Sequence, residues 1–553
     1  MDLLARRLFA ASVLAVSLCG AALAQSAAPA VAADAQVDKI FSRWTSATPG
    51  CAVGVSVAGQ PVLARAYGLA DLEHDVKNTA DTIFEAGSVS KQFTAAAVLL
   101  LVRDGKLSLD DPIQKHIPEL PDYGSPLLVR HMLNHTSGLR DWGSVEGIVG
   151  WPRTTRVNTH AHVLDILARQ RAVNFTPGTR WSYSNSGFNL AAILVSRLSG
   201  MSFAEFSRTR IFEPAGMTHT SWRDDHTRVV KNRAVAYDDR DGRFHIDMPF
   251  ENVHGNGGLL TTVGDLLRWN ENFTMPKVGD AAFVAEQQQV GRFTDGRVHD
   301  YALGLWVRTH KGVREVDHSG STAGYRAHLS RYPDQRVSVA VLCNVSSGDA
   351  TRSARDVADV YLADYLKPTQ VKATHALSDT EATRIIGLYR NTTRGVPVTI
   401  SRDGANLHVE RGAQLLATSA TRFFTANGDT WEFTGRTAKV TDQFGRVDAL
   451  ERVDPWKPTG EQLKALEGVY VSDEAEATLT VAVDDEGLVI KRRPDTVIKA
   501  TPTYVDAFSA GSLGLVIFRR DAEGRVNALS VSQDRVWDLR FSRTAKPGST
   551  EAR

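Results

Sequence analysis

Residues 87–107 read GSVSKQFTAAAVLLLVRDGKL. Within this stretch, residues 95–102 are apolar on every side, which predicts a helix buried inside a domain. Ser88 is expected at or just before the first turn of this helix, where unpaired backbone N–H groups and the positive end of the helix dipole favour an alkoxide-like oxygen. Lys91 follows three residues later and so shares a helical face with Ser88. A partly dehydrated lysine has a lowered pKa and can help to take the serine proton.

Ser88 and Lys91 also have an ordinary structural interpretation. A serine at this position can cap the helix while the lysine extends outward to solvent. Ser-x-x-Lys occurs nowhere else in the chain, however, and here it precedes an entirely apolar helix, where a surface lysine would be poorly placed. The pattern therefore favours a catalytic serine and lysine.

A second motif, Tyr183-Ser184-Asn185, lies in FTPGTRWSYSNSGFNLAAILVSRLSG (175–200). The Pro-Gly pair before it indicates a turn, and an amphipathic helix is expected after it. A tyrosine in a loop beside a serine and lysine can act as a phenolate or can relay the proton to a leaving group. Tyr-x-Asn occurs again at 389–391, so only its order and context favour Tyr183.

The third motif is His318-Ser319-Gly320-Ser321. Small residues after a histidine, in a strand that leads to a turn, allow a substrate backbone to come close. The N–H groups of Ser321 and Ser88 are expected to form an oxyanion hole, in which each donor lowers the barrier by about 3 kcal/mol. His-x-Gly also occurs at 310–312, but that segment lies between two strand-like runs and is predicted to be a hairpin tip.

These three motifs stand in the order that resembles the penicillin-recognising serine hydrolases. This group contains class C β-lactamases, D-alanyl-D-alanine peptidases, related esterases and D-aminopeptidases. The resemblance covers residues 36–366. Three further stretches are similar to the group: HMLNHTSGLRDW (131–142), FEPAGMTHT (212–220) and GNGGLLTTVGDLLRW (255–269).

The resemblance implies acyl transfer to water on a small-molecule or peptide substrate, with no metal or organic cofactor. Ser88 would be the nucleophile, deprotonated by Lys91 and Tyr183. Tyr183, helped by His318, would then protonate the leaving group, and Asn185 would orient Lys91 or the substrate amide. β-Lactamases of this group usually have a positively charged lysine where His318 stands, whereas a histidine is mostly neutral near pH 7. Esters, amides or D-amino-acid peptides are therefore expected as substrates rather than penicillins.

The first domain is expected at 36–366, with strands at both ends and helices between them. Residues 51–57 and 61–67 indicate an opening hairpin, and residues 326–331 and 336–343 a closing one. A helix is predicted from Asp349 to Leu366, because it should stop before Pro368. The resulting α+β fold is a β-lactamase/transpeptidase-like domain, an antiparallel sheet flanked by helices.

Two small antiparallel β-barrel domains are predicted at 380–455 and 460–545, where short alternating segments replace helical periodicity. GLYRN at Gly387 matches GVYVS at Gly468, and FGRVDAL at Phe444 matches EGRVNAL at Glu523. These matches indicate two related modules, separated near Pro455.

The two barrels extend the resemblance to three-domain D-aminopeptidases, which look like this chain from end to end. In those enzymes a long loop of the last barrel enters the active site and limits substrate size. The corresponding stretch here, 504–516, is short. Strict aminopeptidase specificity is therefore not expected.

The N-terminus is typical of a secretory signal peptide at residues 1–24. Arg6 and Arg7 precede an apolar run, and Ala22-Leu23-Ala24 fits a small-x-small cleavage site. The apolar run is too short to cross a bilayer of about 30 Å, and no later segment predicts a stable membrane span. A secreted or periplasmic protein is expected, cleaved after Ala24.

The composition excludes a polyanion as partner. The 553 residues contain 64 Lys plus Arg and 63 Asp plus Glu, so no strong positive field exists to collect nucleic acid. Without the signal peptide only Cys51 and Cys343 remain, too few for a disulfide framework. Export permits a bridge between them, and two buried thiols are an equally good interpretation.

The sequence leaves three rival functions to consider. His160, His162 and Asp165 faintly resemble zinc ligands, but there is no HExxH and the segment reads as a helix start. An α/β-hydrolase is disfavoured because no Gly-x-Ser-x-Gly occurs. The remaining rival is an inactive hydrolase fold that binds peptidoglycan or a protein partner, which a covalent label on Ser88 would distinguish from an enzyme.

Overall fold

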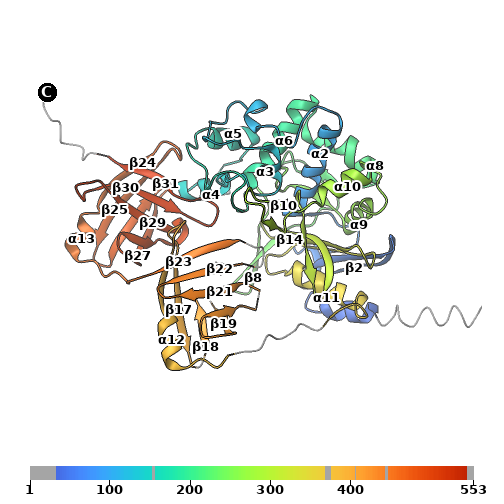
Figure 1. Cartoon of the computed structure of the whole chain (residues 1–553). Coiled ribbons are helices and arrows are strands. Elements are labelled where there is room, and N and C mark those ends of the chain that lie inside the picture. Colours follow the sequence, from blue (N-terminus) through green and yellow to red (C-terminus); the bar gives the residue numbers. More distant parts are fainter. Residues whose placement is uncertain are drawn as a thin grey trace, which may run out of the picture.

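The computed structural model describes residues 33–151, 156–367, 375–404, 406–410, 412–426, 428–442 and 446–544. The predicted signal peptide, residues 1–24, lies outside these ranges. The chain forms an α+β domain followed by two closed eight-stranded antiparallel barrels, so the predicted fold class is confirmed. In Figure 1 the first domain runs from blue to yellow, the first barrel is orange and the second barrel is red.

The sheet of the first domain joins the two ends of that domain. Its six strands are antiparallel and have the order β12-β13-β14-β15-β1-β2. The predicted opening and closing hairpins are β1–β2 and β14–β15, and β1 pairs directly with β15. The strand bounds are β12 Trp306–His310, β13 Val313–Thr322, β14 Tyr325–Tyr332, β15 Val337–Cys343, β1 Cys51–Val57 and β2 Gln60–Tyr67.

A disulfide bond crosses this sheet between Cys51 on β1 and Cys343 on β15. The two cysteines face each other in the strand register and both are buried. Of the two interpretations left open by the sequence, the structure has the bridge. It ties together strands that lie 292 residues apart in the chain.

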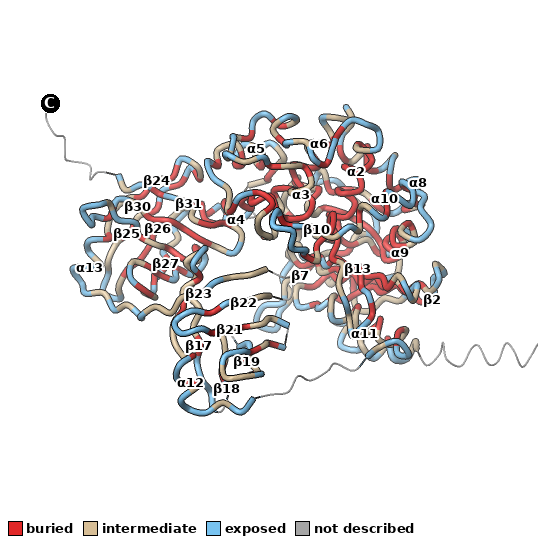
Figure 2. Tube along the Cα trace, viewed as in Figure 1, coloured by how far each residue is buried: buried red, intermediate tan, exposed pale blue. Residues whose placement is uncertain are grey.

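The core of the first domain is built around α2, Lys91–Arg103, which is preceded by the short 3₁₀ turn η1, Gly87–Ser90. Every residue of α2 from Lys91 to Leu101 is buried, as its apolar surface on all sides requires. It packs against α6, Asn185–Ser199. Figure 2 shows buried segments around α2 and the sheet, and others inside the barrels. The other helices used below are α4 Trp142–Val149, α5 His160–Ala168, α9 Val263–Asn272 and α11 Ala350–Tyr361.

The helix α11 ends at Tyr361, five residues before the predicted end at Leu366. Leu362 is fully buried and has φ −108° and ψ 8°, outside helical geometry. The chain then runs back to the sheet, where the N–H of Lys367 donates to the carbonyl of Lys311 in the β12–β13 turn. Burial of Leu362 and this hydrogen bond therefore stop the helix earlier than the proline rule predicts.

The two barrels open in the same way. A short helix, α12 Asp379–Ile385 or α13 Gly460–Lys464, precedes the first strand, β16 Gly387–Asn391 or β24 Gly468–Ser472. In each barrel a buried tyrosine of the first strand donates to a carbonyl four residues upstream, Tyr389 to Ile385 and Tyr470 to Leu466. The first sequence match between the modules is therefore also a structural one.

The second sequence match joins strands that are not equivalent. FGRVDAL runs into β23, Val447–Val453, the eighth strand of the first barrel. EGRVNAL runs into β30, Val526–Ser532, which is the seventh strand of the second barrel. The second barrel is closed by a further strand, β31 Leu539–Arg543, after a loop over residues 533–538. The alignment predicted for this part of the modules is wrong, because a short hairpin motif recurs at different barrel positions.

The stretch 504–516, compared above with a gating loop, packs between the barrels. Tyr504 and Leu515 form an apolar cluster with Leu388 and Val396 of the first barrel, and the Tyr504 hydroxyl donates to the Gly395 carbonyl at 2.5 Å. The stretch therefore serves the contact between barrels. Within the described ranges, no single helix has the length and apolar composition of a membrane span; α6 and the helical segment Phe203–Ala215 reach it only as a pair bent by 83°.

Candidate active site

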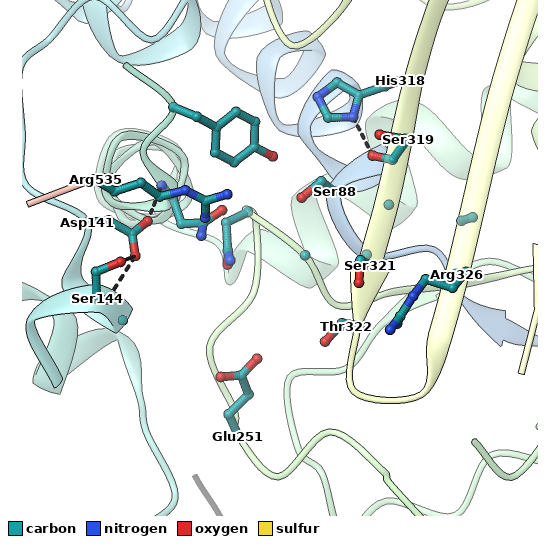
Figure 3. Close-up of a pocket in the computed structure, with 18 of the residues that line it drawn as sticks. Ser88, Asp141, Ser144, Glu251, His318, Ser319, Ser321, Thr322, Arg326 and Arg535 are labelled. Atoms are coloured by element: carbon teal, nitrogen blue, oxygen red, sulfur yellow. Dashed lines mark hydrogen bonds between the residues drawn. The ribbon is translucent and has the colours of Figure 1, made fainter. Parts of the chain in front are cut away.

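A cavity lies where η1 meets residues 318–322 of β13, beyond the part of this strand that pairs with β12. It has a volume of about 880 Å³ and is lined by Ser88, Tyr183, Asn185 and His318, so the structure brings these predicted residues together. Gly320 and Ser321 of β13 also line it. Figure 3 shows Ser88 facing the strand that carries His318, Ser319 and Ser321. The volume suits a small molecule or a short peptide.

Two glycines allow β13 to approach the turn that carries Ser88. Gly87 has φ +50°, and a Cβ added there would lie 2.6 Å from the backbone nitrogen of Ser321. A Cβ at Gly320 would lie 2.0 Å from the Ala86 carbonyl oxygen and 3.0 Å from the Ser88 nitrogen. Both contacts are too short for any other residue type. The close approach places the N–H groups of Ser88 and Ser321 at the same cavity wall, as an oxyanion hole requires.

The amine of Lys91 is completely buried and lies next to the Ser88 hydroxyl, with 3.0 Å between Nζ and Oγ. Burial lowers its pKa well below the ordinary value, the positive charge of Arg535 lowers it further, and Asp141 opposes the shift. Nζ also donates to Asn185 Oδ1 at 2.9 Å and to the Asn256 carbonyl at 2.7 Å. A neutral amine has two N–H donors and one lone pair, so these two acceptors leave the lone pair for the Ser88 proton.

Tyr183 reaches Ser88 from the loop before α6. Burial raises the pKa of its phenol above the ordinary value, while a hydrogen bond with Ser88 and the charge of Arg535 oppose the rise. The phenol is therefore neutral near pH 7, which supports a proton relay rather than a resting phenolate. Its ring packs against the ring of His135, with 4.2 Å between centroids.

His318 is buried and both of its ring nitrogens are engaged. Nδ1 lies 2.6 Å from the carbonyl oxygen of Ser319, which can only accept, so Nδ1 carries the proton. Nε2 then accepts from the hydroxyl of Tyr301 at 2.8 Å. Burial lowers the pKa of His318 to about 3, with the Lys91 charge as the next cause. His318 is thus a neutral acceptor. The resemblance implies that it assists Tyr183 directly in proton transfer, but its Nε2 is occupied by the hydroxyl of Tyr301.

His135 forms the floor below Tyr183. It is fully buried, has φ +62°, and its Nδ1 accepts from the N–H of Ser184 at 3.2 Å. Its ring contacts Tyr183, Phe188 and Tyr301. The site therefore includes an aromatic support for Tyr183.

Arg535 enters the cavity from the second barrel, in the loop between β30 and β31. Its guanidinium carbon lies 4.7 Å from the centroid of the Tyr183 ring. Figure 3 shows the side chain pointing toward Ser88 from the side of Asp141. The third domain thus contributes a charged group to the site.

Sequence reasoning missed Tyr301, His135, Asn256 and Arg535. His135 and Asn256 lie in the stretches 131–142 and 255–269, which are similar to the group, but the similarity alone assigns neither residue a role. Tyr301 and Arg535 belong to no motif, and only the packing of β12 and the second barrel brings them to the cavity.

The segment considered as a zinc site has other contacts. His160 Nε2 lies 2.9 Å from the carbonyl oxygen of His254, and the two histidine rings contact each other with 4.3 Å between centroids and a tilt of 42°. His162 caps the start of α5 together with Thr159. Among the residues that the structure describes, no group of three or more His, Cys, Asp or Glu side chains is placed to hold a metal ion.

Comparison with known proteins identifies similar chains. A family model described as Beta-lactamase matches residues 32–363. A D-aminopeptidase of Brucella ovis is 27% identical over 506 residues, which are 87% of this chain and 93% of that protein. A penicillin-binding protein of Bacillus subtilis is 27% identical over 397 residues, 66% of this chain and 85% of that protein. Among solved structures, a penicillin-binding protein homologue from Pyrococcus abyssi has a TM-score of 0.54 at 24% identity and covers 73% of this chain and 96% of its own, which shows likeness of fold.

Proposed function

The chain belongs to the beta-lactamase family of serine hydrolases, and from this premise we propose that it works through an acyl-enzyme on D-amino-acid-containing peptides or amides. The observation that carries the proposal is the Ser88–Lys91 pair, in which a buried amine with a lowered pKa lies 3.0 Å from the serine hydroxyl.

The first half of the reaction forms the acyl-enzyme. The lone pair of Lys91 takes the proton of Ser88, and Oγ attacks the substrate carbonyl. The N–H groups of Ser88 and Ser321 stabilise the oxyanion that develops. When the intermediate collapses, the neutral phenol of Tyr183 donates its proton to the leaving group and is reprotonated from Lys91.

The second half releases the acyl group. Water enters the position that the leaving group has vacated and attacks the acyl carbon, while Lys91 and Tyr183 accept its proton. Ser88 leaves with a proton, and the enzyme returns to its starting state. The residues of this chain supply a group for each proton transfer, so the cycle closes without a further reagent.

The choice of D-amino-acid substrates rests on similarity to a D-aminopeptidase that matches 87% of this chain. Glu146 and Glu251 line the same cavity as Ser88, and their carboxylates favour a cationic group such as a substrate α-amino group. Neutral His318 supplies no positive charge, which makes efficient penicillin hydrolysis unfavourable. Because a simple ester needs no positive charge at this position, ester hydrolysis is the second candidate function.

The cell compartment is also a proposal. We expect export and cleavage after Ala24, on the basis of the sequence of residues 1–24. Intact mass of the protein purified from the extracytoplasmic fraction checks this. A mass that includes residues 1–24 contradicts cleavage.

The test of the function labels the nucleophile. The purified protein is treated with an activated serine-reactive phosphonate and weighed by intact-mass spectrometry. One adduct is expected, absent in Ser88→Ala and retained in Ser144→Ala, which removes another hydroxyl of the cavity. Turnover of D-alanine p-nitroanilide, p-nitrophenyl acetate and nitrocefin then separates a D-aminopeptidase, an esterase and a β-lactamase. No adduct and no turnover would support the inactive binding protein instead.

A further inference from the structure

Arg535 is held in the cavity by its backbone. Its carbonyl accepts from the N–H of Asp141 at 3.2 Å and from the Asn174 side-chain amide at 3.0 Å. Two residues later, the N–H of Trp537 donates to Asn174 Oδ1 at 2.8 Å. These bonds dock the loop between β30 and β31 on the first domain. The guanidinium is therefore not required for docking.

The guanidinium of Arg535 has unused hydrogen-bond donors. In the described part of the chain the guanidinium lies over the ring of Tyr183 and its charge acts on the buried Lys91 and His135, but no hydrogen bond or ion pair engages its nitrogens. The neighbouring carboxylate of Asp141 is occupied by the N–H groups of Asn185 and Ser144, at 2.8 Å and 3.0 Å. A planar guanidinium with five donors is suited to bind a carboxylate through two parallel hydrogen bonds.

The other arginines of the cavity are already engaged. Arg308 donates twice to the Asp317 carboxylate, at 2.6 Å and 2.7 Å. Arg326 donates to the carbonyls of Ala323 and Tyr325, at 2.8 Å and 2.7 Å. Arg535 is thus the cavity arginine with the most unused hydrogen-bonding capacity among the described residues.

The position of Arg535 selects one side of the substrate. In the proposed reaction the hydroxyl of Tyr183 gives its proton to the leaving group, so the leaving group lies at the Tyr183 phenol. The Arg535 guanidinium lies over the ring of the same tyrosine. A charged substituent on the leaving group therefore comes within reach of Arg535, whereas His318 on β13 offers no positive charge to it.

We propose that Arg535 binds a carboxylate on the leaving group, so that the preferred substrates release an amino acid or another acid with a free carboxylate. The inference rests on the proposed function and narrows its substrate class to peptides that end one residue after the scissile bond. The acyl group then passes first to Ser88 and afterwards to water. The released amine or alcohol keeps its carboxylate, which takes no part in the bond changes. The third domain thereby determines specificity at the catalytic centre.

The test uses two esters that differ in one charge, 3-acetoxybenzoate and 3-acetoxybenzamide. Their leaving groups have the same shape, and only the first carries a carboxylate. We expect the ratio of kcat/KM, anionic over neutral, to fall at least about tenfold in Arg535→Gln and to recover in part in Arg535→Lys, since a bidentate hydrogen-bonded charge pair is stronger than a neutral hydrogen bond. Arg525→Gln removes an exposed arginine of the same barrel and should leave the ratio unchanged.

An unchanged ratio in Arg535→Gln overturns the inference, and so does an equal loss on both esters, which would mean that Arg535 only supports Tyr183. Calorimetric binding of 3-hydroxybenzoate, the anionic product, tests Arg535 without turnover. If the wild type labels at Ser88 and hydrolyses both esters but binds the product as Arg535→Gln does, the inference alone fails. If neither ester is hydrolysed, the proposed function fails, and the binding difference still decides the role of Arg535.

Discussion

Lys91 has no exposed atom and no carboxylate within hydrogen-bonding distance; its two N–H groups donate to an amide and a carbonyl oxygen, and its lone pair faces the Ser88 hydroxyl. Such surroundings stabilise the neutral amine, which is the form that can accept a proton. We expect Lys91→Gln to lower kcat/KM for p-nitrophenyl acetate by about 10²–10⁴. In the wild type, activity should persist far below pH 10.5, because the lowered pKa keeps the amine neutral there.

Lys106→Gln is the matched control, since Lys106 lies exposed just beyond the end of α2. Its activity should stay within twofold of wild type. The role of Lys91 as base is wrong if Lys91→Gln retains at least a third of wild-type activity, or if the wild-type rate rises only above pH 10.

Tyr301 fixes His318 through one hydrogen bond to a buried nitrogen. In Tyr301→Phe that nitrogen loses its donor, and an unsatisfied buried polar atom costs about 1–3 kcal/mol of unfolding free energy. We therefore expect a lower melting temperature together with a lower kcat. Tyr123→Phe is the control, because the Tyr123 hydroxyl is buried and has no hydrogen-bond partner among the described residues. Equal melting temperatures for the two variants would contradict the positioning role of Tyr301.

At the scale of residues, the sequence located the groups whose spacing is local. Ser88 and Lys91 share a helical turn, and Tyr183 and Asn185 are two residues apart at the start of α6. Tyr301 could not be found in this way, because its role depends on a contact with His318 across the β12–β13 hairpin, and no local spacing in the sequence indicates that contact.

At the scale of elements, the sequence predicted the hairpins of the first domain correctly, but it predicted the end of α11 and the alignment of the two barrels incorrectly. The alternating segments of β1, β2, β14 and β15 carry their own pairing signal, and the structure has both hairpins. The end of α11 depends on burial of Leu362 against the sheet, which no local pattern encodes. The barrel alignment failed at β23 and β30 because a turn motif with alternating residues fits any strand of a barrel.

The bridge between β1 and β15 joins two cysteines that lie 292 residues apart in the chain. A crosslink over so many residues restricts the unfolded chain strongly. Its loss typically lowers the free energy of unfolding by about 2–5 kcal/mol. We expect the double variant Cys51→Ala/Cys343→Ala to melt at a lower temperature while Ser88 is still labelled. A thiol assay on the denatured, unreduced protein should find neither cysteine free. Identical melting curves with and without reductant would contradict the prediction.

At the scale of the whole molecule, buried and half-buried neutral histidines make the first domain sensitive to acid. Burial lowers the pKa of these four to about 3 or 4: His131, His254, His299 and His318. Between pH 6.5 and about 4 the unfolded chain binds protons that the folded chain does not, so the unfolding free energy falls as pH falls, by up to about 1.4 kcal/mol per pH unit for each group. Above pH 6.5 this contribution is complete.

The barrels should respond less, because their two histidines, His375 and His408, are exposed or half-buried. Scanning calorimetry between pH 7 and 4.5 should therefore show that the melting temperature of the first domain falls by more than that of the barrels. The first-domain transition is recognised because phosphonate labelling of Ser88 shifts it. A common shift of all transitions would contradict the assignment.

The contact between the second barrel and the first domain is centred on Arg140. Its side chain is 3% exposed and donates to the carbonyls of Trp537 and Asp538, while a further nitrogen donates to Glu474 at 2.7 Å. The barrel returns a matching contact, since Arg492 donates to the carbonyls of Gly147 and Ile148 in α4. Figure 1 shows α4 beside the red barrel. The same loop that Arg140 holds carries Arg535 into the cavity.

Arg140→Met should therefore affect stability and specificity together. Removing one partner of a buried ion pair leaves an uncompensated carboxylate and typically costs about 3–5 kcal/mol. We expect faster hydrogen exchange in α4 and in residues 533–538, and a lower preference for 3-acetoxybenzoate over 3-acetoxybenzamide, because Arg535 is no longer fixed. Arg171→Met removes an exposed arginine from the same interface, whose ion pair with Asp473 spans 3.4 Å, and should change neither. If Arg140→Met loosens the interface but keeps the ester preference, then Arg535 does not depend on docking, and the barrel acts on the active site by another route.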